Sequence, residues 1–262
     1  MDIAAAPSLR GNAVSEIEVF LGPTMPADEA AKLLPATYLP PAAVGDVYRA
    51  TQRGPATLLI VDGYFERVPA VWHKEILYAL SLGIAVVGCA SMGALRAAEL
   101  HPYGMVGHGV IFERYRDGGY EDDDEVAVAH ADAGSGYRCG SDAMVNIRYG
   151  LAQARLLRLV SPATAHALET IAKQQFYPDR HWGTLLAAGG RDGLAETELA
   201  ALAGFVRDTR PDLKRADTVA TLRMLAAEPV PPPDPLAFEF EPTLAWQRLR
   251  WLESPDRRES AS

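Results

Sequence analysis

The chain has 262 residues, 48% of them hydrophobic, and a formal net charge of −9. That length and composition predict a folded protein with a full core and exclude a disordered chain. The acidic balance offers no basic surface for nucleic acid or an anionic membrane, so neither is an expected partner. No apolar run approaches the roughly 18 residues that a membrane-spanning helix needs.

The cysteine content and the N-terminal residues indicate a cellular compartment. Cys89 and Cys139 are the only cysteines, too few for a disulfide framework. The N-terminal residues contain neither the basic nor the apolar segment of a secretory signal. We therefore expect a cytoplasmic, reduced protein. No phosphate-binding glycine motif follows a predicted strand, so we expect no cofactor. His130, at the end of a predicted strand, is a candidate metal ligand or catalytic residue, but no second histidine lies at ligand spacing, so we expect no metal ion.

The first half of the chain alternates predicted strands and helices. Strands are expected at residues 17–21, 57–61, 84–88 and 126–130, and helices at 26–34, 43–52, 69–82 and 92–100. This order predicts an α/β fold with an open, doubly wound, mostly parallel sheet, followed by a helical subdomain. The functional edge of such a sheet lies at the carboxyl ends of its strands.

The second half reads as mainly helical. Helices are expected at residues 142–160, 163–175, 196–206 and 216–227, followed by a stiff proline-rich linker and a helix at 242–252. That last helix carries Trp246 and Trp251, and it either contacts a partner or packs back on its own domain. We expect an α/β core domain at residues 15–155, a helical subdomain at 156–228, and the linker with its amphipathic helix at 229–262.

Ser91 lies where the predicted strand at 84–88 passes into the next helix. The string Cys89-Ala90-Ser91-Met92-Gly93 approaches the Gly-x-Ser-x-Gly nucleophile elbow of α/β-hydrolases, with Cys in place of the first Gly. Its small residues allow a tight reversal that points free helix N–H groups at the site beside Ser91. Ser91 is therefore a candidate nucleophile, and its alternative role is an ordinary helix cap.

Two residues of the preceding helix are candidates for the general base. His73 stands near the helix N-terminus, where the dipole favours the neutral, proton-accepting ring, although a buried structural histidine is the alternative. Lys74 would form a Ser-Lys dyad instead, and the sequence does not decide between the two. Asp62 ends a buried strand at the same edge, where it orients His73, caps the following turn or binds a substrate amine.

Further residues near this edge are assigned to the substrate. The N–H groups of Gly63 and Met92 would stabilise an oxyanion, and Arg96 would bind an anionic end unless it simply pairs with Glu99. Cys89 is either a small buried residue or a sulfur-handling thiol. The acidic run at 121–125 is interpreted as a solvated loop facing a basic partner. The substrate-binding candidates are Gly63, Tyr64, Glu66, Met92 and Arg96.

Eight short strings, in order between Ile17 and Arg155, are similar to the core of the TfuA family. They are Val19–Pro23, Tyr38–Pro41, Gly45–Tyr48, Val61–Phe65, Val71–Ile76, Ala90–Leu100, Asp123–Val128 and Met144–Arg148. The resemblance fades across the helical second half and the tail. Separately, the five residues Ala90–Ala94 look like the nucleophile string of Clp-type peptidases, which suggests a peptidase as a third hypothesis.

The resemblance to the TfuA family implies a role beside a YcaO enzyme in making backbone thioamides. The implied task is sulfur delivery by hydrolysis of a thiocarboxylated, ubiquitin-like sulfur-carrier protein, with a peptide substrate as a further candidate partner. The competing hypothesis is a non-catalytic adaptor that recruits or activates the YcaO enzyme. The hydrolase hypothesis requires a nucleophile at Ser91, whereas the adaptor would use the acidic run and the Trp-bearing tail.

Overall fold

The structure is a computed structural model that describes residues 16–64, 68–233 and 238–254. Within these residues, five parallel strands form a sheet in the order β2-β1-β3-β4-β5. Its strand bounds are β1 (Ile17–Phe20), β2 (Thr37–Leu39), β3 (Thr57–Ile60), β4 (Ala85–Cys89) and β5 (Val106–His108). The strand order reverses beside β1, as in doubly wound sheets, so the predicted α/β fold class is confirmed.

The central strands are apolar on both sides. Every residue of β3 and β4 is buried, which is the pattern of parallel strands with helices on both faces. Neighbouring residues enter different cores, since Val86 packs with Phe20 on one face and Val87 with Val19 on the other. Burial of each such side chain contributes about 1.5–3 kcal/mol to folding.

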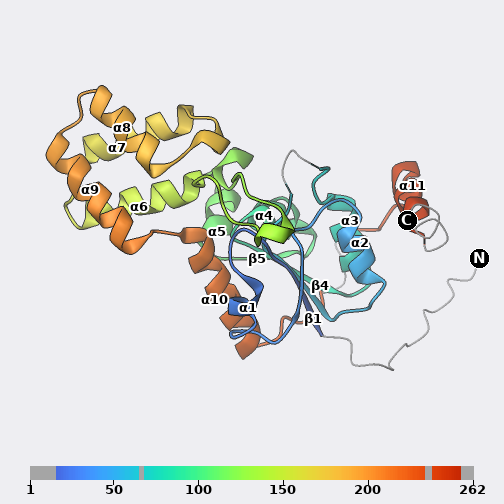
Figure 1. Cartoon of the computed structure of the whole chain (residues 1–262). Coiled ribbons are helices and arrows are strands. Elements are labelled where there is room, and N and C mark those ends of the chain that lie inside the picture. Colours follow the sequence, from blue (N-terminus) through green and yellow to red (C-terminus); the bar gives the residue numbers. More distant parts are fainter. Residues whose placement is uncertain (1–15, 65–67, 234–237, 255–262) are drawn as a thin grey trace, which may run out of the picture.

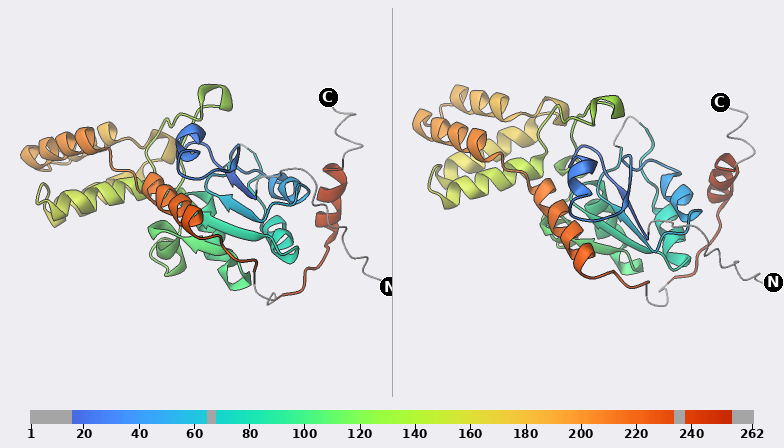
Figure 2. Two further views of the ribbon diagram at one scale, coloured as in Figure 1. Left: turned by 90° about the horizontal axis from the view of Figure 1, so that it is seen from below. Right: turned by 60° about the horizontal axis from the view of Figure 1, so that its bottom comes forward.

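Helices cover both faces of the sheet (Figures 1 and 2). The face that includes Val86 packs against α2 (Asp46–Thr51), α3 (His73–Ser81), α4 (Met92–Leu100) and α5 (Val110–Arg116). The opposite face packs against α1 (Ala27–Ala30) and α10 (Leu213–Ala227), which contribute Ala30, Leu222 and Leu225. The carboxyl ends of β1, β3 and β4 are left for the connecting loops, and these loops build the candidate site.

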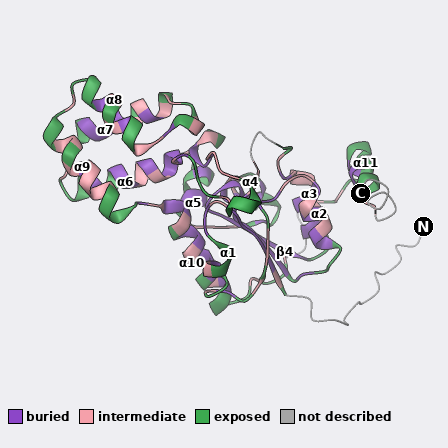
Figure 3. Cartoon of the chain, in the orientation of Figure 1, coloured by how far each residue is buried: buried purple, intermediate pink, exposed green. Residues whose placement is uncertain are grey.

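The remaining helices form a lobe at one end of the sheet, as Figures 1 and 2 show. It contains α6 (Met144–Leu156), α7 (Pro162–Gln174), α8 (Trp182–Arg191) and α9 (Glu196–Thr209). These helices share a core of their own, with Leu151, Leu168, Leu185 and Leu202 fully buried in it. In Figure 3 their outward surfaces are exposed. The helical second half predicted from the sequence is thus present, although α10 returns from the lobe to the sheet.

The C-terminal helix α11 (Leu244–Leu252) lies at the other end of the molecule. Trp246 is only 1% exposed, and its ring packs against Tyr48 and Tyr78 at centroid distances of 5.5 and 4.8 Å. Of the two alternatives for this helix, the structure has the one in which it packs back on the chain. None of the helices in the described residues is long and apolar enough to cross a membrane.

Three local predictions need correction, and three elements were missed. Residues 126–130 form a loop rather than a strand, with an isolated bridge from His130 to Cys139. The helix expected from residue 69 begins at His73, and the one expected at 26–34 is a single turn. The two edge strands β2 and β5 were not predicted, because they are three residues long, partly exposed and weakly patterned. The sequence pattern also gave no indication of α8.

Candidate functional site

The turn between β4 and α4 is strained. The Ser91 N–H donates to the Cys89 carbonyl oxygen at 2.7 Å, and Ala90 between them has φ of 61°. This is a classic γ-turn, a rare conformation that costs a non-glycine residue about 1–3 kcal/mol. Ser91 stands at the N-cap position of α4, yet its hydroxyl makes no capping hydrogen bond. The helix-cap interpretation of the Ser91 side chain is therefore wrong.

Close packing places Ser91 beside the end of β3. The Gly93 N–H donates to the Val61 carbonyl oxygen at 3.2 Å, which joins the first turn of α4 to that strand. A Cβ atom built on Gly63 would lie 2.7 Å from the Met92 side chain, so these two residues are in contact. Among the described residues, no acceptor is found for the N–H groups of Gly63 and Met92. Both are free to bind a ligand.

Ser91 lines a small pocket of about 100 Å³ at the carboxyl edge of the sheet. Pro23, Gly63, Tyr64 and Met92 line it from the loops that follow β1, β3 and β4. Asp123, the loop at 126–130 and the short 3-10 turn η4 (Tyr177–Asp179) contribute the rest of its lining. The pocket thus lies where the helical lobe meets the sheet. Ser91 is only 7% exposed, and its hydroxyl has no hydrogen-bond partner in the described part of the chain.

His130 is the histidine that the structure brings into this pocket. Its Nδ1 lies 2.8 Å from the Ala131 carbonyl oxygen, and a carbonyl only accepts, so Nδ1 carries the proton. In the neutral ring Nε2 is then the proton acceptor. The ring also lies against Tyr64 and Tyr137, with centroids 5.9 and 6.0 Å apart. From the sequence, His130 was expected at the end of a strand and was not connected with Ser91, because no local pattern predicts the path of the loop to which it belongs.

His73 occupies a different place. It is the first residue of α3, and its Nε2 lies 2.8 Å from the carboxylate of Glu99 on α4. Arg96 donates to the same carboxylate at 2.7 Å and to the Val71 carbonyl at 3.1 Å. Partial burial raises the pKa of Glu99, but the His73 and Arg96 contacts outweigh this effect and lower it. No hydrogen bond joins His73 to Ser91 within the described ranges, and His73 does not line the pocket.

Asp62 and Lys74 also point elsewhere. Asp62 is 1% exposed and accepts hydrogen bonds from the N–H groups of Gly22 and Thr24 and from the Thr24 hydroxyl. It therefore holds the loop after β1, and so indirectly the pocket residue Pro23. The Lys74 ammonium lies 4.7 Å from the centre of the Phe240 ring, against the C-terminal segment. Glu66 lies outside the described residues.

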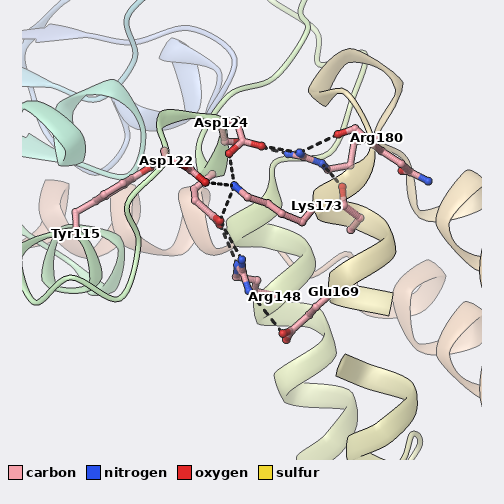
Figure 4. A network of polar contacts seen from close by, with 10 residues as sticks. Tyr115, Asp122, Asp124, Arg148, Glu169, Lys173 and Arg180 are labelled. Atoms are coloured by element: carbon pink, nitrogen blue, oxygen red, sulfur yellow. Dashed lines mark hydrogen bonds and ion pairs between the residues drawn. The ribbon is translucent and has the colours of Figure 1, made fainter. Parts of the chain in front are cut away.

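Three of the five acidic residues at 121–125 pair with basic side chains of the chain itself (Figure 4), whereas Glu121 and Asp123 are exposed and make no ion pair among the described residues. Lys173 of α7 pairs with Asp122, Asp124 and Glu125. Glu125 also accepts from Arg148 of α6 at 2.9 and 3.0 Å. Arg180, with a fully buried side chain, donates to the Asp124 carboxylate at 2.8 Å and to its backbone carbonyl at 3.2 Å. These contacts fix the start of the loop that carries His130 to the helical lobe.

The other reactive groups are less suited to chemistry. Cys89 is 0% exposed, and burial raises the pKa of its thiol to about 12 despite hydrogen bonds with Thr221 and Thr218. It is therefore a protonated core residue. Among the residues that the structure describes, no three His, Cys, Asp or Glu side chains gather as a metal site.

The sequence model of the TfuA-like protein family covers residues 62–181. That segment begins at Asp62 and contains Ser91, His130 and the ion pairs of Arg180, but it excludes β1, β2 and β3. No curated protein matches the chain. Residues 62–181, just under half of the chain, are therefore similar to TfuA-like proteins.

Proposed function

We propose that the protein hydrolyses the thiocarboxylate at the end of a sulfur-carrier protein and releases sulfide for thioamidation by a YcaO enzyme. The TfuA-like segment supports the pathway and the YcaO partner. One observation supports the proposed chemistry most directly. Ser91 follows a strained turn and lines a small pocket that His130 also lines, and its hydroxyl has no hydrogen-bond partner among the described residues. Backbone strain of this kind is concentrated at functional sites.

The chemistry follows the order of a serine hydrolase. Ser91 Oγ attacks the thiocarboxylate carbon while His130 Nε2 accepts the hydroxyl proton. The free N–H groups of Met92 and Gly63 stabilise the oxyanion, each worth about 3 kcal/mol. Collapse of the tetrahedral intermediate breaks the C–S bond, and sulfide leaves with the proton from His130. Water then hydrolyses the acyl-serine, so that one thiocarboxylate and one water give a carboxylate and hydrogen sulfide.

The site suits a small anionic group. The pocket of about 100 Å³ has room for only a few non-hydrogen atoms, which favours an unbranched chain end over a bulky side chain. The N-terminus of the nine-residue helix α4 lies beside Ser91, and its positive dipole end attracts a thiocarboxylate anion.

The adaptor hypothesis has less support than it had from the sequence. Its two features were the acidic run and the tryptophan-bearing tail. Lys173, Arg148 and Arg180 pair with most of the acidic run, and Trp246 packs inside the chain. Contacts within the chain thus account for much of both features, whereas no hydrogen bond among the described residues uses the Ser91 hydroxyl.

Ser91→Ala tests the proposal directly, because alanine fits a turn of small residues. With a synthetic peptide that ends in a glycyl thiocarboxylate, we expect sulfide release to fall at least 10³-fold while the folded state is retained. Ser81→Ala is the matched control, since Ser81 lies at the far end of α3 and donates to the Tyr78 carbonyl. Sulfide release at the native rate by folded Ser91→Ala protein would overturn the proposal.

A further inference from the structure

A second hollow adjoins the Ser91 pocket. It has a volume of about 440 Å³ and runs along α4, between Leu95, Arg96 and Glu99 on one side and residues 121–123 on the other. Met92 and Asp123 line both hollows, so the two lie side by side. We call the second hollow the α4 groove. Ser91, a residue that is 7% exposed, lines the Ser91 pocket and not the groove, so it stands at the inner end of the two hollows.

The α4 groove is acidic. Four carboxylates line it, from Glu99, Glu121, Asp122 and Asp123, against the single guanidinium of Arg96. Arg96 and the neighbouring His73 both contact Glu99, and Lys173 contacts Asp122. Glu121 and Asp123 are exposed and have no ion-pair partner in the part of the chain that the structure describes. The groove therefore keeps negative charge that the protein itself does not balance.

Anchoring of the loop does not account for these charges. Asp124 and Glu125 make the buried contacts with Arg180 and Arg148, and Asp122 adds a third contact to Lys173. Glu121 and Asp123 take no part in that network, yet they stand on the groove side of the loop. Their charge is therefore available to a group that enters the groove.

We propose that the α4 groove binds the part of the carrier tail just before its reacting end, and that this part carries a lysine or arginine. The inference rests on the proposed function and names the chemistry of its substrate. Glu99 follows Met92 by seven residues, which is about 10 Å along a helix. An extended chain covers that distance in about three residues. The basic side chain therefore belongs two to four residues before the thiocarboxylate.

Binding of three labelled peptides tests this inference. They end in an ordinary glycine carboxylate, the product group, and differ only in having Lys, Gln or Glu three residues before the end. Against Ser91→Ala protein we expect the Lys peptide to bind at least threefold more tightly than the Gln peptide, and the Glu peptide to bind most weakly. Higher salt is expected to reduce these differences.

Substitutions of acidic residues test whether the preference for the Lys peptide arises in the α4 groove. Glu121→Gln with Asp123→Asn is expected to remove most of the preference for Lys over Glu. Asp192→Asn with Glu196→Gln, two exposed acids at the turn between α8 and α9, is expected to preserve it. Equal or undetectable binding of all three peptides, or a preference unchanged in the groove variant, overturns the inference.

The outcomes separate this inference from the proposed function. The peptides bear no sulfur, so their binding does not depend on turnover. A preference for Lys together with no sulfide release from the matching thiocarboxylates would support the groove and refute the hydrolase. Sulfide release without any charge preference in binding would support the hydrolase and refute the groove.

Discussion

Gly93 packs so closely against Ile60 that a Cβ atom at position 93 would lie 1.7 Å from the Ile60 carbonyl oxygen. Only glycine permits this approach of α4 to β3, and Ser91 lies two residues before it. Gly93→Ala must displace the start of α4. We expect a loss of stability of about 1–3 kcal/mol, as for other overpacked sites, together with loss of sulfide release.

Denaturant unfolding and the sulfide assay check this expectation. Gly183→Ala is the matched control, because a Cβ atom at that position of α8 meets nothing within 4 Å. Alanine should be neutral there or stabilise the helix by up to about 1 kcal/mol. Native activity in Gly93→Ala protein would show that the position of α4 is not critical.

The two histidines near the sheet edge are expected to differ in their effects. His130→Gln removes the proton acceptor that lines the pocket and should lower kcat by about 10²–10⁴-fold. His73→Gln removes only a contact to Glu99 on the outer side of α4 and should leave kcat within about twofold. Steady-state assays of sulfide release by the two variants, run in parallel, compare their kcat values and identify which histidine is the base. The opposite result would assign the base to His73.

The sheet and the position of Ser91 were predictable because they follow from local patterns. A buried apolar run, a cluster of small residues and an amphipathic segment specify strand, turn and helix within about fifteen residues. Asp62 was correctly predicted at the carboxyl edge of the sheet, because it directly follows a buried apolar run. Its partners Gly22 and Thr24 were not predicted, since that contact spans about forty positions of the chain.

The position of His130 in the Ser91 pocket could not be predicted for a related reason. His130 lies in a loop whose path depends on Arg180 and Lys173, roughly fifty residues further along. No periodicity encodes such pairs. The sequence favours His73 as the base because its helix and the Ser91 helix start at the same edge of the sheet, which should bring their first turns close together. The structure begins α3 so that residue 73 meets Glu99 instead of Ser91.

Arg180 is expected to be essential for the loop that carries His130. Its guanidinium donates to the Asp124 carboxylate and to the backbone carbonyls of Asp124, Ala172 and Gln175. Lysine has one ammonium and cannot reach all four acceptors. In Arg180→Lys protein we expect about 2–4 kcal/mol less stability, the usual effect of disrupting a buried charge pair.

Urea denaturation measures this effect. Arg207→Lys is the control, since Arg207 pairs with Asp208 while remaining 75% exposed, and such surface pairs contribute little. A change below about 0.5 kcal/mol is expected there. If Arg180→Lys were equally mild, the network in Figure 4 would not be what holds the loop.

The two cysteines are expected to differ sharply toward thiol reagents. Cys139 is exposed, whereas Cys89 is completely buried and its pKa is raised from 9.0 to about 12. Only the thiolate reacts, so raising the pH from 7 to 9.5 should not render Cys89 reactive in the folded protein. Mass spectrometry after iodoacetamide treatment should find the label on Cys139 alone, and on both residues after unfolding. Cys89→Ala should retain more than half of the sulfide release, whereas a persulfide on Cys89 during turnover would assign the chemistry to that thiol instead of Ser91.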